Sequence, residues 1–126
     1  MSDILAEQAK LAAKRVAPEV VAEMGIEVVG LILTQVFAFL ASCKNRENPN
    51  PAEVQAAVRE EQEADPKRLL RRTARRIRGT ADSPMTRKQS FALARASIEQ
   101  ALQMTEETAA ACCSAVPNDL VLGEGD

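Results

Sequence analysis

A run of sixteen uncharged residues, 28–43, constrains the fold of this chain more than any other feature. The run reads VVGLILTQVFAFLASC and is flanked by Glu27 and Lys44. Built as a helix, it would carry bulky apolar side chains on every side, with only a poor polar stripe around Thr34 and Gln35. Such a helix needs apolar surroundings, which lipid, partner helices or the core of a bundle can supply.

The length of the run is borderline for a membrane span. Sixteen helical residues reach roughly 24 Å, whereas the hydrocarbon core of a bilayer is roughly 30 Å thick. Counting back to Met24 gives twenty residues but includes Glu27. The chain offers few other bulky residues to cover the helix, because it has no Trp, no Tyr and only three Phe. We therefore expect a membrane-embedded helix within residues 18–44, with the central core helix of a bundle as the alternative.

Prolines and capping residues divide the rest of the sequence into helices. The same device, a capping residue followed by a first-turn proline, occurs twice, as Asn50 with Pro51 and as Asp65 with Pro66. Thr86 and Gln89 have the spacing of a capping box. Small apolar residues then recur at helical spacing up to Val116, before Pro117, and predict one long final helix.

These signals predict an all-α fold of several helices, with one long apolar, membrane-embedded helix and an extended helical C-terminal region. We divide the chain into an N-terminal amphipathic helix at 1–17, the apolar transmembrane helix at 18–44, a charged helical region at 45–116 and a tail at 117–126.

An arginine-rich segment, KRLLRRTARRIRG at 67–79, dominates the charged region. On a helical wheel its apolar side chains share one face, and the other face carries Arg68, Arg71, Arg72, Arg75, Arg76 and Arg78. Three interpretations stay open: a solvated face, contact with anionic lipid headgroups or acidic partner subunits, and contact with nucleic acid. The last interpretation lacks an aromatic platform or a recognised nucleic-acid-binding fold in the sequence.

The sequence contains few of the residues that catalysis and metal binding usually require. It contains no histidine, so the usual general base and the commonest metal ligand are missing. Its three cysteines, Cys43, Cys112 and Cys113, are odd in number, and the adjacent pair is expected to fill a helix face as small apolar residues. We expect no enzyme activity, no catalytic residue, no cofactor and no metal site.

Residues 22–39 read AEMGIEVVGLILTQVFAF, and their start resembles the A-E-x-G-x-E-x-x-G signature of the optic atrophy 3 protein family. Members of that family are small mitochondrial membrane proteins in which this motif opens a hydrophobic segment and a charged helical region follows. The resemblance implies a mitochondrial membrane location. In physical terms, Gly25 and Gly30 would permit close helix packing, and Glu27 would lie at headgroup level, pair inside a complex or face water.

Together these features predict a non-catalytic accessory or structural subunit of a mitochondrial inner-membrane complex, anchored by one apolar helix. Its partners would be the other subunits of that complex and anionic phospholipid, with contacts at Glu27 and at the six arginines. The alternative is a soluble oligomeric helical protein, in the cytoplasm or a virion, that binds nucleic acid through the arginine-rich helix as a virion or packaging component.

Overall fold

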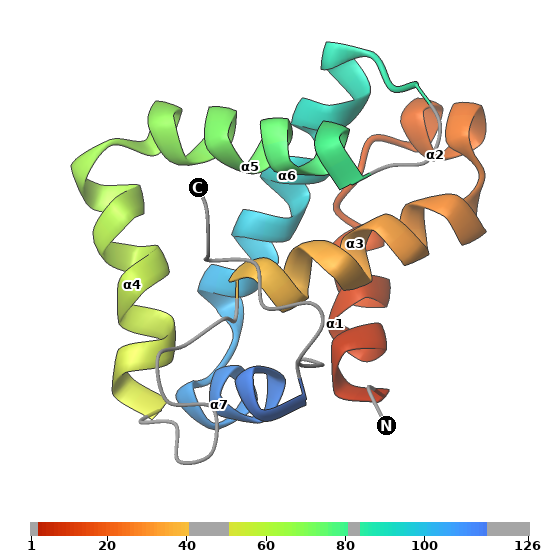
Figure 1. Cartoon of the computed structure of the whole chain (residues 1–126). Helices are drawn as coiled ribbons and strands as arrows, with labels where there is room; N and C mark the ends of the chain where they lie inside the picture. Colours follow the sequence, from red (N-terminus) through yellow and green to blue (C-terminus); the bar gives the residue numbers. More distant parts are fainter. Residues whose placement is uncertain (1–2, 41–50, 81–83, 116–126) are drawn as a thin grey trace.

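A computed structural model describes residues 3–40, 51–80 and 84–115, and these residues form seven helices without any strand. The helices are α1 (Asp3–Ala13), α2 (Pro18–Met24), α3 (Ile26–Leu40), α4 (Pro51–Ala64), α5 (Pro66–Thr80), α6 (Arg87–Gln103) and α7 (Glu106–Ala115) (Figure 1). The all-α prediction is confirmed. The Asn50 cap, Cys43 and the tail at 117–126 lie outside the described residues.

The apolar helix α3 runs through the middle of the molecule and contacts α1, α2, α5, α6 and α7 (Figure 1). Its inward face is buried at helical spacing by Val29, Ile32, Leu33, Val36, Phe37 and Leu40. The opposite face is exposed and includes Ile26, Val28 and Leu31. The chain's own helices therefore provide the apolar surroundings of one face of α3, as the bundle alternative requires.

The apolar region 18–44 is not one continuous helix. It breaks at Gly25, where α2 and α3 meet at an angle of 103°. Gly25 has a φ of 94°, a backbone conformation that residues other than glycine rarely adopt. Its N–H donates to the carbonyl of Val21 over 2.8 Å. The glycine thus ends α2 and lets the chain turn sharply into α3. The apolar pattern of the sequence does not reveal the break, because apolar residues continue on both sides of it.

The break at Gly25 shortens the helix that is expected to span a membrane. Within the described ranges, no helix combines the length and the apolar character that a membrane crossing needs. The bent pair of Pro18–Met24 and Ile26–Phe37 meets those requirements only when the two helices are counted together.

The long final helix predicted from residue 86 onward is also two helices. The capping box at its start is confirmed, since the Gln89 N–H donates to Thr86 Oγ1 over 3.0 Å and the Thr86 N–H donates to Gln89 Oε1 over 3.1 Å. The helix stops at Gln103, however, and Thr105 caps α7 by accepting the Thr108 N–H over 3.1 Å. This second cap lets α7 turn back against α4 and α1.

A buried polar contact fastens α1 to α6. The Gln100 amide donates from Nε2 to Gln8 Oε1 over 2.9 Å, and Gln100 Oε1 accepts from Arg15 Nε over 3.0 Å. Gln8 and Gln100 are only 8% and 6% exposed. Because buried amides need partners, this contact fixes how the two helices align.

Candidate functional site

The arginine-rich helix α5 lies with its apolar face inward, as the helical wheel predicts. Leu69, Thr73, Ala74 and Ile77 are buried, and the Arg68, Arg71, Arg72 and Arg75 side chains are exposed. Arg76 and Arg78 are partly buried. The helix begins as expected, because the carboxylate of Asp65 accepts the Arg68 N–H over 3.1 Å ahead of Pro66.

One side of the arginine face is engaged with the acidic helix α4. Arg72 donates from Nη2 to both carboxylate oxygens of Glu61, over 2.9 Å and 2.6 Å. Burial lowers the pKa of Arg76 below its ordinary value, and the nearby charge of Arg72 adds to the effect. The ion pair with Glu61 offsets part of the positive charge on this side of the helix.

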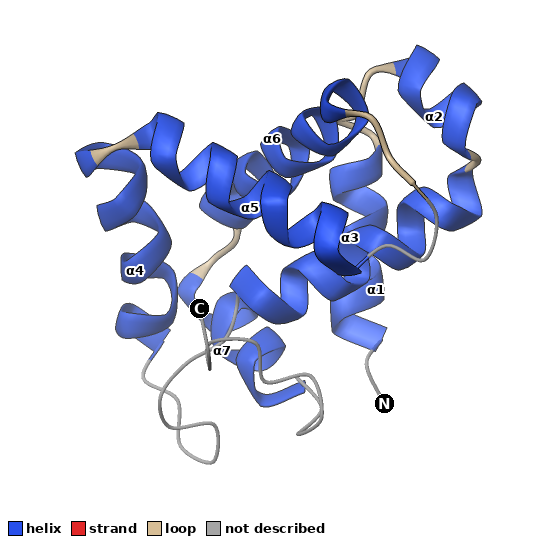
Figure 2. Cartoon of the chain, turned by 45° about the horizontal axis from the view of Figure 1, so that its top comes forward, coloured by secondary structure: helices blue, strands red, loops and turns tan. Residues whose placement is uncertain are grey.

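The other side of the helix, which we call the cationic edge, consists of Lys67, Arg71, Arg75 and Arg78. These residues are three or four positions apart, so their side chains follow one another along α5. The edge borders α6, which packs against α5 (Figure 2) and carries three further exposed cations, Arg87, Lys88 and Arg95. The two helices together contain one acidic residue, Glu99.

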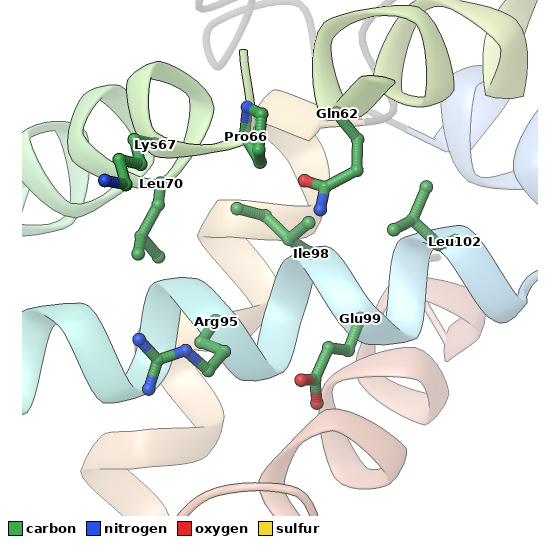
Figure 3. A pocket seen from close by; sticks show the side chains of 8 residues that line it. All are labelled: Gln62, Pro66, Lys67, Leu70, Arg95, Ile98, Glu99 and Leu102. Atoms are coloured by element: carbon green, nitrogen blue, oxygen red, sulfur yellow. The ribbon is translucent and has the colours of Figure 1, made fainter. Parts of the chain in front are cut away.

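At the start of α5, the cationic edge borders a pocket of about 260 Å³ between α5, α6 and the end of α4 (Figure 3). Pro66, Leu70, Ile98 and Leu102 supply its apolar lining. Its polar lining comes from Gln62, Lys67, Arg95 and Glu99. In Figure 3, Lys67 and Arg95 lie at the same end of the pocket, one from each helix.

At the other end of α5, the cationic edge meets an aromatic ring. Arg78 donates from Nη1 to Ser90 Oγ over 2.8 Å, and its Cζ lies 6.0 Å from the ring centroid of Phe91. The Cζ of Arg87 lies 5.3 Å from the same centroid. Both distances are within the range of cation–π contacts. The sequence reasoning found no aromatic partner for the arginines because Phe91 belongs to the next helix and only the α5–α6 packing brings it near.

The remaining predicted site residues lie on the α2–α3 elbow. Glu27 is exposed in the first turn of α3, where the helix dipole favours a negative charge. A Cβ atom added to Gly25 or Gly30 would meet no described atom within 4 Å, so the described part of the chain does not pack closely against either glycine. Close packing of the glycines against a partner and a contact of Glu27 with lipid or a partner both stay predictions.

The cysteines and the acidic side chains show no reactive arrangement among the described residues, where no group of three or more could hold a metal ion. Burial raises the pKa of the free Cys112 thiol to about 11, so it is protonated at neutral pH and a poor nucleophile. Cys113 is buried and disulfide-bonded, which means that the two adjacent cysteines are not bonded to each other.

Comparisons with known proteins find no match to this chain among family models, curated proteins or solved structures.

Proposed function

We propose that the protein is a non-catalytic helical binding protein that holds the phosphates of nucleic acid along the cationic edge of α5. The observation that carries this proposal is the regular spacing of Lys67, Arg71, Arg75 and Arg78 beside the exposed cations of α6. From Lys67 to Arg78 the edge extends roughly 16 Å at 1.5 Å per residue. Cations spaced along such a length can contact several consecutive phosphates and release their counterions.

The distribution of apolar side chains favours nucleic acid over a lipid surface as the ligand of α5. A basic helix that lies on a membrane inserts its apolar face while its cations contact the headgroups. In α5 that apolar face is packed into the core. The large apolar side chains that are exposed in the described residues, Leu11, Ile26, Val28 and Leu31, belong to α1 and α3.

The proposal is tested by replacing Arg71 and Arg75 with Gln, which removes two charges and keeps a good helix former at both positions. Binding to arbitrary oligonucleotides, followed by fluorescence anisotropy over a range of salt concentrations, should weaken. The slope of log K against log salt should fall by about 1.8 for duplex DNA and about 1.4 for single strands, since each lost phosphate contact removes about 0.9 or 0.7.

A matched control is the double variant Lys10→Gln and Lys14→Gln, which makes the same charge change at two exposed positions, one in the last turn of α1 and one directly after that helix. It should keep the parent's salt slope. If the α5 variant binds like this control at the same ionic strength, the arginines form only a solvated face and the proposal is wrong.

A second candidate function is the accessory subunit of a mitochondrial inner-membrane complex, in keeping with the motif at residues 22–39. The observation that favours it is the elbow of α2 and α3, which together are long and apolar enough for a broken span, with Ile26, Val28 and Leu31 exposed on α3. An embedded protein should stay with the membrane pellet after alkaline carbonate extraction. Complete release into the supernatant would contradict this candidate.

A further inference from the structure

Phe91 is the only aromatic side chain of α6, and it lies at the end of the cationic edge. It is partly buried and packs against the hydrophobic core. The guanidinium groups of Arg78 and Arg87 lie within 6.0 Å and 5.3 Å of the ring centroid. A partly exposed ring with two guanidinium groups over it differs from an ordinary core phenylalanine.

The two arginines are held differently. Arg78 is fixed by its hydrogen bond to Ser90 Oγ, and this hydroxyl in turn donates to the carbonyl of Arg87 over 3.0 Å. Ser90 is fully buried, so the end of α5 is tied firmly to the first turn of α6. Arg87 is exposed at the start of α6, and its long side chain can move away from the ring without disturbing the core.

We propose that Phe91 is a stacking platform for one unpaired nucleobase, and that the protein therefore binds single-stranded nucleic acid in preference to duplex. This inference rests on the proposed function, because the cationic edge would hold the phosphates that lead to the stacked base. Aromatic rings bind bases of any sequence through their faces, and arginine adds a cation–π contribution. In a duplex both faces of a base are already stacked on neighbouring bases, so the ring gains nothing there.

The geometry assigns a role to each neighbour of the ring. Arg78 stays beside the ring and neutralises the phosphate next to the stacked nucleotide. Arg87 moves with the incoming base and closes over it or over its phosphate. The cations from Arg75 back to Lys67 follow the backbone of the strand along α5.

The chain offers a direct optical test, because it contains no Trp and no Tyr. In the variant Phe91→Trp, the indole is the only such fluorophore and lies at the proposed platform. Adding a single-stranded oligonucleotide should quench its fluorescence, because a base stacks on it. A duplex of the same length and sequence should bind through its phosphates with little quenching. Vesicles of anionic phospholipid should produce neither binding nor quenching.

Affinity measurements on Phe91→Leu complete the test, because leucine keeps most of the apolar packing but offers no ring face. Affinity for the single strand should fall about 5- to 150-fold, which is what one lost stacking contact costs, and duplex affinity should be unchanged. Phe91→Tyr, which retains the ring, should bind like the parent. Far-UV circular dichroism and thermal unfolding of each variant show whether the fold is intact.

The outcomes separate this inference from the proposed function. If single strands and duplexes bind the parent equally and Phe91→Leu changes neither affinity, the stacking role of Phe91 is wrong. Phosphate binding along the cationic edge is then still supported. If the parent binds no nucleic acid, or only the vesicles bind and quench the indole, both are overturned. Selective loss of single-strand affinity in Phe91→Leu, together with quenching by single strands alone, supports both.

Discussion

At the scale of single residues, Gln100 is the side chain on which the alignment of α1 and α6 depends. Its amide contacts Gln8 and Arg15, and two of the three side chains are almost fully buried. When a buried polar group loses its hydrogen-bond partner, the free-energy cost of removing that group from water is no longer offset. The amide of Gln8 would be such a group if Gln100 were shortened.

We predict that Gln100→Ala lowers the free energy of unfolding by about 1–3 kcal/mol, because Gln8 is left unpaired in the interior. Urea unfolding followed by circular dichroism measures this value. Gln103→Ala is the matched control on the same helix, since Gln103 is exposed and its loss should change stability by less than about 0.5 kcal/mol. Equal effects of the two variants would show that the buried contact contributes little.

At the scale of helices, the backbone break at Gly25 shapes the N-terminal half of the molecule. The glycine has a φ of 94° and sits between helices that meet at 103°, whereas Gly30 lies inside α3 with ordinary helical surroundings. Neither glycine has a described neighbour close enough to clash with an added methyl group. Backbone conformation alone therefore separates the two positions.

Alanine substitutions at the two glycines should have opposite signs. Gly25→Ala should destabilise the fold by about 1 kcal/mol or more, because alanine is strained at this φ. Gly30→Ala should stabilise it by about 0.5–1 kcal/mol, because alanine loses less backbone entropy in a helix. Thermal unfolding of both variants and of the parent measures the sign of each change in stability. A stable Gly25→Ala variant would mean that the elbow is not needed for folding.

The helices also show where sequence reasoning succeeds. Local signals predict the starts of α4 at Pro51 and α5 at Pro66 and the Thr86 cap ahead of α6, because caps and first-turn prolines act within one turn of the chain. The breaks at Gly25 and before Thr105 were missed, because apolar periodicity continues across both and hides the turn. The two faces of α5 were predictable from spacing alone. The contact of Arg78 with Phe91 was not, since it depends on tertiary packing.

At the scale of the whole molecule, α3 is the element around which the other helices are arranged. Val36 on its inner side is 2% exposed, and Leu31 on its outer side is 67% exposed. The same apolar run thus has one side that belongs to the core and one side that does not. Substituting a charged residue first on the inner side of α3 and then on the outer side distinguishes a helix that is only part of the core from one that also contacts a membrane.

We predict that Val36→Arg destabilises the protein by about 3–5 kcal/mol, because it buries a charge without a partner. Leu31→Arg should leave stability within about 0.5 kcal/mol of the parent if its side faces water. Unfolding experiments measure both effects. If Leu31→Arg instead abolishes membrane retention in cells while the purified domain stays folded, the outer face of α3 contacts lipid or a membrane partner.

The grouping of charge on α5 and α6 also makes the molecule strongly dipolar. α5 carries seven cations and α6 three, against a single acid, although the chain as a whole has a net charge of −2. Beyond about one Debye length, roughly 8–10 Å at moderate salt, these charges are largely screened, so a polyanion senses them only at short range. If the protein binds nucleic acid as proposed, productive encounters are those in which α5 and α6 face the strand. If copies of the protein covered a strand in this orientation, their acidic surfaces would face outward. The bound layer would then stay one protein thick and would not bind a second strand.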